Sequence, residues 1–210
     1  MTPSAKRLIY ASGMALLLVG CETPVTYEPA AGASAQGEIQ APSFAVGDEF
    51  WYSTNRSVYV EVFEGEEDGR LLFRRGGGSE TLVFSDQMAL VQLRDQAGVR
   101  ETYDPDDGRL AFPLTLGKTW ERTYQVFDTG GGPQVQRTRA CQVAERGFAT
   151  VPAGRFEVFR IDCALSELKV VEVQREQVFY APEIGRIILR LSERRGYRER
   201  LLEFNPAAPN

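Results

Sequence analysis

The sequence predicts an all-β protein, built as one curved and largely antiparallel sheet of about 10–12 strands. Short stretches rich in β-branched and aromatic residues alternate with period two, as in Val58–Phe63 and Ile187–Leu191. Turn-forming segments such as Gly76–Gly78 and Pro182–Gly185 separate these stretches. No stretch of helical length shows a 3.6-residue period, so helices are not expected to contribute to the core.

The chain has 210 residues, of which 43% are hydrophobic and 25% charged, which suits one globular domain. We divide it into a signal peptide (1–20), a lipidated cysteine with a flexible tether (21–43), a single β domain (44–206) and a short tail (207–210). The tether is poor in large apolar side chains and rich in Ala, Gly, Pro and Ser. Such a composition cannot bury enough surface to offset its ordering entropy.

The first twenty residues have the features of an export signal. Lys6 and Arg7 supply a positive start, and a short apolar run follows that is too brief to span a bilayer as a helix. The run ends in Leu18-Val19-Gly20-Cys21, which resembles the lipobox of bacterial lipoproteins. We therefore expect cleavage before Cys21 and a lipid on its thiol, which attaches the chain to a membrane. An ordinary secretory peptide or an uncleaved signal anchor is the alternative.

The residue after Cys21 bears on the destination. In enteric bacteria an aspartate at that position retains a lipoprotein in the inner membrane, whereas this chain has Glu22. We expect a lipid-anchored protein of the cell envelope, placed at the outer membrane and facing the periplasm.

Two further cysteines, Cys141 and Cys163, remain in a compartment where disulfides persist. Both lie in strand-like segments on either side of the turn sequence Val151–Gly154. An antiparallel pairing around this turn brings them nearly opposite each other, which predicts a disulfide. Two separately buried thiols are the alternative.

Charge and composition exclude several functions. The formal net charge is −5, and removal of Lys6 and Arg7 with the signal peptide lowers it to −7, so a general nucleic-acid binder is not expected. Histidine is absent, and we find no nucleophile elbow, phosphate loop or zinc spacing. We therefore predict no catalytic residues, no metal and no cofactor. Carboxylates such as Glu157 and Asp162 leave an acid–base glycosidase open.

Four groups of residues together resemble a known kind of envelope domain. They are Val46-Gly47-Asp48 with Trp51, Phe112-Pro113-Leu114 with Gly117-Lys118-Thr119-Trp120, Val151–Phe156, and Tyr180–Gly185. This set is similar to uncharacterised lipoproteins of Gram-negative bacteria that share the LolA/LolB-like half-barrel. The resemblance implies a strongly curved sheet that wraps a hydrophobic concavity over residues 44–204. The helical lid of LolA and LolB has no counterpart in this sequence.

Two candidate surfaces follow. Large aromatic side chains are candidates for an apolar ligand surface, with core packing the favoured interpretation: Trp51, Trp120, Phe156 and Tyr180. Arginines near the C-terminus could form a patch for anionic lipid or a partner, and cross-strand pairing with glutamates is the alternative: Arg190, Arg194, Arg195, Arg198 and Arg200.

Two function hypotheses result. The first is a non-enzymatic binding module whose curved sheet holds an apolar ligand, a lipid or an acyl chain. The second is a structural or interaction lipoprotein with a filled core that docks an envelope protein partner. A deep apolar concavity favours the first, and a filled interior with an exposed apolar patch favours the second.

Overall fold

The computed structural model describes residues 24–30, 37–130, 132, 134–168, 170–193 and 196–208. Within them, thirteen strands and one short 3₁₀ turn follow one another along the chain, and no described segment is an α-helix. The elements are β1 (Thr26–Pro29), β2 (Glu49–Thr54), β3 (Val58–Glu67), β4 (Arg70–Arg75), η1 (Gly76–Gly78), β5 (Glu80–Phe84), β6 (Leu90–Asp95), β7 (Gly98–Asp104), β8 (Thr119–Asp128), β9 (Val135–Val151), β10 (Gly154–Glu167), β11 (Gln174–Ala181), β12 (Arg186–Ser192) and β13 (Tyr197–Asn205).

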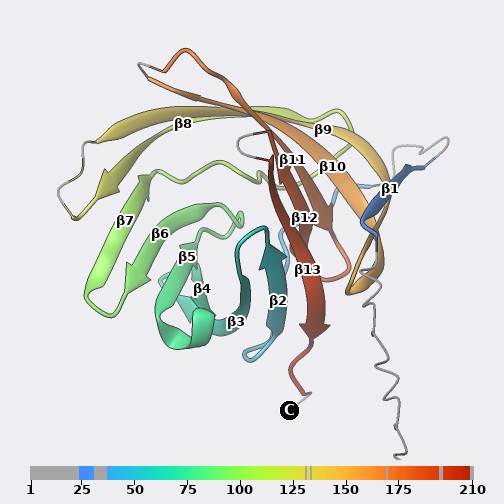
Figure 1. The fold of residues 1–210 in the computed structure, drawn as a ribbon, viewed down its shortest axis with the longest axis horizontal. Coiled ribbons are helices and arrows are strands. Elements are labelled where there is room, and N and C mark those ends of the chain that lie inside the picture. The colour runs from blue at the N-terminus through green and yellow to red at the C-terminus, as the bar shows by residue number, and fades with distance from the viewer. Residues whose placement is uncertain are drawn as a thin grey trace, which may run out of the picture.

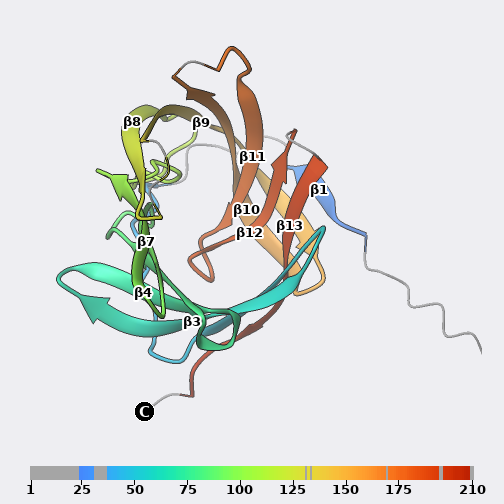
Figure 2. The ribbon, with the colours of Figure 1, turned by 60° about the vertical axis from the view of Figure 1, so that its left-hand side comes forward.

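The strands form one antiparallel sheet in the order β1-β9-β10-β11-β12-β13-β2-β3-β4-β5-β6-β7-β8. A further pairing between β8 and β9 joins the two sides of this sheet. Strands β2 to β13 therefore close into a twelve-stranded barrel, while β1 lies outside the ring (Figures 1 and 2). The all-β, antiparallel prediction is confirmed.

The predicted half-barrel is wrong, because the sheet is closed. Strand β9 is seventeen residues long and offers one edge to two partners. Its first half pairs with β8 through Val135–Gln142, and its second half pairs with β1 through Gly147–Thr150. Alternation along a sequence shows which residues form strands and which face they use, but not which edges meet. The closure of the barrel could therefore not be predicted from the alternation of apolar and polar residues.

The predicted tether also differs from the structure at two places. Strand β1 pairs with β9, and Ile39 forms an isolated bridge with Leu114. The ring of Tyr27 lies 5.1 Å from that of Phe179, and its hydroxyl donates a 3.1 Å hydrogen bond to Glu145. A few well-placed contacts to an existing sheet edge hold a segment whose composition alone predicts disorder.

The barrel interior is divided into an apolar part and a charged part. Aromatic rings fill the end where β2 begins and β13 ends, with neighbouring centroids 4.9–6.2 Å apart among Phe44, Phe50, Phe63, Phe73, Phe84 and Phe204. We call this end the base. The opposite end of the interior contains charged side chains, and there the candidate site lies. Among the described residues no helix is long and apolar enough to cross a membrane.

The predicted disulfide is formed. Cys141 in β9 and Cys163 in β10 are directly opposite in the register of the two strands, and their sulfur atoms are bonded. Both residues are buried, so the bond joins two adjacent barrel strands beneath their outer surface.

Candidate anion-binding site

The end of the barrel opposite the base contains a hollow of about 420 Å³, which we call the mouth. The turn after β2, the loop after β7 and strands β6 to β13 contribute its wall. Arginine and tyrosine dominate the charged and aromatic part of the lining, which is Arg56, Arg109, Arg137, Arg139, Arg190, Tyr103, Tyr124, Tyr197, Asp107 and Glu167. Arg137 pairs with Glu167 at 3.2 Å and Arg109 with Asp107 at 3.0 Å. With two more carboxylates beneath the lining, Glu176 and Glu199, the five arginines face four carboxylates, so the excess of positive charge is that of one guanidinium group.

Strand register directs these side chains inward. Arg137 and Arg139 are two residues apart in β9, so both point to the same face of the sheet. Arg139 is buried, with 4% of its surface exposed. Asp107 lies in the loop between β7 and β8, where its carboxylate accepts the backbone N–H groups of Leu90 at 2.9 Å and Arg109 at 3.2 Å. These two bonds fix the loop beneath the mouth.

A network of ion pairs forms the floor of the mouth. Arg139 contacts Glu176 at 3.1 Å and Asp107 at 3.9 Å. Arg190 pairs with Glu176 and, at 3.3 Å, with Glu199. Each buried carboxylate has at least one guanidinium beside it, which is the condition for keeping a charge inside a protein.

The arginines keep these carboxylates ionised. Burial by itself raises the pKa of Glu176, but Arg190 and Arg139 outweigh it and lower the pKa below its ordinary value. Burial likewise raises the pKa of Asp107, but Arg109 and Arg139 outweigh it and the pKa is lowered. For Glu199, Arg190 and hydrogen bonds from two tyrosines outweigh burial, and the pKa is also lowered. The network is therefore fully charged at neutral pH.

Two tyrosines of the mouth, Tyr103 and Tyr197, have a raised pKa and stay neutral. Burial raises the pKa of Tyr103, and its hydrogen bond to Glu101 at 2.6 Å adds to the effect. Burial and Glu199 likewise raise the pKa of Tyr197. Each of these phenols donates its single O–H to a carboxylate, Tyr103 to Glu101 and Tyr197 to Glu199 at 2.7 Å, so the arginines are the groups left to donate to a ligand.

Several guanidinium nitrogens in this part of the barrel have no hydrogen-bond partner among the described residues. They include Nε of Arg109, Nε of Arg139 and Nη1 of Arg186, all buried. An unsatisfied buried donor costs about 1–3 kcal/mol, so its presence calls for an explanation. Arg56 also forms no ion pair with any residue that the structure describes. Unused donors and excess positive charge are together the features of an anion-binding site.

A small inner cavity of about 60 Å³ lies below the mouth. Arg109 and Arg190 line both spaces. Arg186 also lines the inner cavity. It forms an ion pair with Glu61 and with no other carboxylate among the described side chains. The positive lining thus continues from the mouth into the centre of the barrel.

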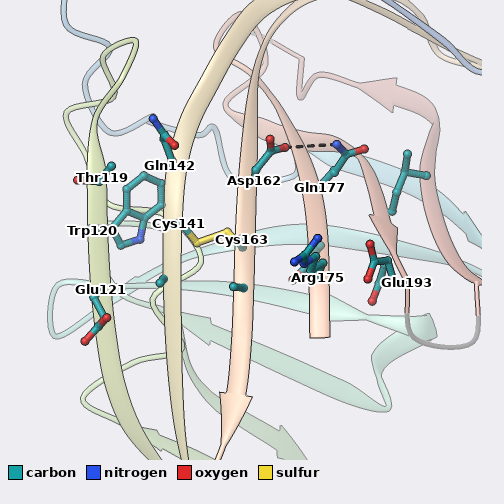
Figure 3. Close-up of a pocket in the computed structure, with 15 residues that line it drawn as sticks. Thr119, Trp120, Glu121, Cys141, Gln142, Asp162, Cys163, Arg175, Gln177 and Glu193 are labelled. Atoms are coloured by element: carbon teal, nitrogen blue, oxygen red, sulfur yellow. Dashed lines mark hydrogen bonds between the residues drawn. A yellow bond between two sulfur atoms is a disulfide. The ribbon is translucent and has the colours of Figure 1, made fainter. Parts of the chain in front are cut away.

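The largest hollow, about 980 Å³, lies on the outer wall over strands β8 to β12 (Figure 3). Exposed side chains of alternate residues border it, including Gln142 and Gln177, and the amide of Gln177 donates a 3.4 Å hydrogen bond to Asp162. The buried disulfide lies beneath its floor. Acidic side chains outnumber Arg175 here, and no described group of three or more Cys, Asp or Glu residues could hold a metal. Carboxylates therefore outnumber cationic groups in the lining of this hollow, whereas arginines outnumber carboxylates in the lining of the mouth.

The four predicted aromatic residues do not share one surface. Tyr180 is buried in the core beside Phe112, and Phe156 packs at the core's edge. Trp120 borders the outer hollow and donates from its indole to the Gly108 carbonyl at 2.8 Å. Trp51 is 36% exposed on the outside of β2. No pocket described above contains more than one of them.

The predicted arginine patch is split between two faces. Arg190 points into the mouth and pairs with glutamates. Arg198 and Arg200 border a separate hollow with Asn55. Arg194, Arg195 and the predicted lipidation site Cys21 lie outside the described residues.

Sequence reasoning did not identify Arg56, Arg109, Arg137 and Arg139 as site residues. One signal could have identified two of the four: the sequence Arg137-Thr138-Arg139 places two arginines on the same face of a strand. Arg56 and Arg109 occupy loops, and only the closed barrel brings them to the same place.

No known family model matches the sequence, and no curated protein is significantly similar to it. Solved structures are similar in fold. The hypothetical lipoprotein YmcC of Escherichia coli is 11% identical with a TM-score of 0.52, over 81% of this chain and 88% of that one. A predicted lipoprotein of Parabacteroides distasonis is 12% identical with a TM-score of 0.47, over 81% of this chain and all of the other. The likeness to YmcC supports the fold, and the link to LolA and LolB is not confirmed.

Proposed function

We propose that this chain is a lipid-anchored envelope protein whose barrel binds the anionic group of a ligand, a carboxylate or a phosphate, in the mouth. The lipobox ending in Cys21 supports the anchor, and the disulfide between Cys141 and Cys163 suits an oxidising compartment. The observation that carries the binding site is the lining of the mouth, where five arginines face four carboxylates of the lining and floor and Arg56 has no ion pair among the described residues.

The filled base makes the barrel a poor container for an acyl chain. Phe50 and Phe73 are fully buried, and Phe44, Phe63 and Phe84 surround them. An apolar ligand of useful size would have to displace these rings. The mouth, by contrast, has room for a small polar ligand, and arginines line it.

Guanidinium groups suit carboxylate and phosphate because their planar donors bind two oxygens at once. The ion-pair network below the mouth holds Arg139 and Arg190 in place before any ligand arrives, so little ordering cost remains. The proposed activity is therefore recognition without catalysis, and no covalent step is involved.

Thermal unfolding of the mature chain with inorganic phosphate or citrate tests the proposal. A ligand that binds only the native state raises stability by RT ln(1 + [L]/Kd), so the midpoint must rise with anion concentration. The double variant Arg56→Gln, Arg137→Gln should lose most of this rise. The matched control is Arg155→Gln, which removes an equally long, 52% exposed arginine near the base. Equal responses of the double variant and the control would reject the mouth as the binding site.

Membrane attachment is tested separately. The variant Cys21→Ala should appear in the soluble fraction of the envelope, whereas the parent chain sediments with membranes. Unchanged sedimentation of the variant would contradict the lipid anchor and leave the anion site unaffected.

A further inference from the structure

Strand β1 fixes the start of the described chain to the base of the barrel. Thr26 pairs with Thr150 and Pro29 with Gly147, next to the turn that joins β9 and β10. Only five positions separate Thr26 from Cys21. At about 3.5 Å per residue the lipid-bearing cysteine can lie no further than about 18 Å from the start of β1. A lipid on Cys21 therefore keeps the base close to the membrane.

The mouth is at the other end of the same strands. Arg137 lies thirteen positions from Thr150 along β9, which corresponds to up to about 43 Å in an extended strand. Figures 1 and 2 show the β10–β11 connection projecting at the top, away from β1. A chain anchored at its base thus directs the mouth away from its own membrane.

Exposed apolar side chains gather beside the mouth. Ten large hydrophobic residues are exposed in the part of the chain that the structure describes, and four of them lie between β10 and β11. We call these the apolar loop: Leu168, Val170, Val171 and Val173. Val171 is fully exposed and Leu168 is 60% exposed. Such a concentration of apolar surface in one loop indicates an interaction site.

The apolar loop and the mouth form a continuous surface. Glu167 lines the mouth and also a neighbouring hollow of about 430 Å³. That hollow includes Leu168 and Val170 from the loop and Val135 from β9. The backbone N–H of Leu168 donates to the Gln136 carbonyl at 2.9 Å, so the first residue of the apolar loop is held against β9.

The chemistry of this surface determines what can cover it. A protruding apolar loop fits into a recess on another molecule, and the positive mouth beside it attracts negative charge. Both features occur in membrane-inserting loops as well as in protein interfaces. The anchor at the base, however, places the chain's own membrane at the wrong end for insertion. A protein in the surrounding compartment is the occupant that agrees with the exposed apolar loop, the positive mouth and an anchor at the opposite end of the barrel.

We propose that the apolar loop and the mouth together dock a protein partner, which covers Val171 and Val173 and presents an acidic side chain or chain terminus to Arg56 and Arg137. The inference rests on the proposed function, because it assigns the bound anion to a protein. It commits the site to a protein rather than to a free small molecule or a lipid headgroup.

Site-specific photocrosslinking in the cells that produce the full-length chain tests this inference. A benzophenone amino acid replaces Val171 or Val173, and a control replaces Arg155 near the base. We expect one protein to be crosslinked from both loop positions and not from position 155. Adding Arg56→Gln and Arg137→Gln should reduce the yield at Val171 by at least fivefold, at equal expression and equal melting temperature.

Three results would overturn the inference. Crosslinks to lipid alone would make the loop a membrane contact. No crosslink at either loop position would mean that no protein covers it. A crosslink unaffected by the arginine substitutions would separate the loop from the mouth. Anion-dependent thermal stabilisation of the same variants, measured in parallel, shows whether the proposed anion site itself survives in each case.

Discussion

Arg186 and Glu61 form an ion pair inside the barrel although 125 residues separate them in the sequence. The two side chains are 6% and 3% exposed. The guanidinium group of Arg186 also lies over the rings of Phe73, at 4.3 Å, and Phe50, at 4.9 Å. This pair therefore marks the boundary between the aromatic base and the charged interior, and it connects β12 to β3.

Replacing Arg186 with methionine should destabilise the barrel strongly. Breaking a buried pair by removing one partner costs roughly 3–5 kcal/mol when the remaining charge is uncompensated. Glu61 keeps its contact with Arg75 at 2.6 Å, so we expect a loss at the lower end of this range. Urea unfolding of the mature chain gives the free energy of unfolding. Arg155→Met is the control, since Arg155 pairs with Glu28 on the surface and should cost less than about 1 kcal/mol. Equal losses for the two variants would show that the buried pair contributes no more to the free energy of unfolding than the surface pair does.

The buried carboxylates predict acid sensitivity. The pKa values of Asp107, Glu176 and Glu199 are lowered in the folded chain, so these groups stabilise it above the pKa of unfolded carboxylates, near about 4. That contribution is lost as the pH falls through their folded pKa values. Urea midpoints should decline steeply below about pH 4. Glu176→Gln should flatten the decline, and the exposed Glu183→Gln should leave it intact; identical curves for both variants would refute the assignment.

The sequence predicted the strands well because alternation reports burial directly. Val58–Phe63 and Ile187–Leu191 both lie within observed strands, β3 and β12. Closure was missed because it depends on β8 and β9 meeting edge to edge, through pairs such as Trp120 with Cys141. The single-sequence pattern contains no information about such long-range edge pairing.

The site was harder to predict than the fold. Arg190 was identified as part of an outward patch, yet it points inward because Glu176 and Glu199 offer it buried partners. Arg109 and Asp107 come from the loop between β7 and β8, which no sequence pattern assigned to a site. Their roles depend on the loop entering the closed barrel, where Asp107 meets Arg139. Charged residues inside a small barrel contradict the usual sorting of polar residues to the surface, so composition alone misplaces them.

The disulfide predicts a redox-dependent stability. Cys141 and Cys163 enclose a loop with a sequence separation of 22, for which the chain-entropy model gives a stabilisation of about 3 kcal/mol. The variant Cys141→Ser, Cys163→Ser should unfold at correspondingly lower urea concentration than the oxidised parent. Dithiothreitol should lower the midpoint of the parent and leave that of the variant unchanged. A parent chain that is insensitive to reduction would show that the bond adds little.

Gly147 provides a test of the position of β1. A Cβ atom at this residue would lie 2.4 Å from the Glu28 carbonyl oxygen and 2.8 Å from the Tyr27 ring, so Gly147→Val must push β1 off the edge of β9. Because the barrel closes through β8 and β9 without β1, we expect the urea midpoint to fall only slightly. Limited proteolysis should instead cut the variant around residues 24–30 far faster than the parent. The control Gly37→Val changes a glycine that has no atom within 4 Å of its Cβ position and no positive φ, and it should leave that region protected. Protection of residues 24–30 in the Gly147 variant would mean that contacts other than the close approach to Gly147 hold β1 on β9.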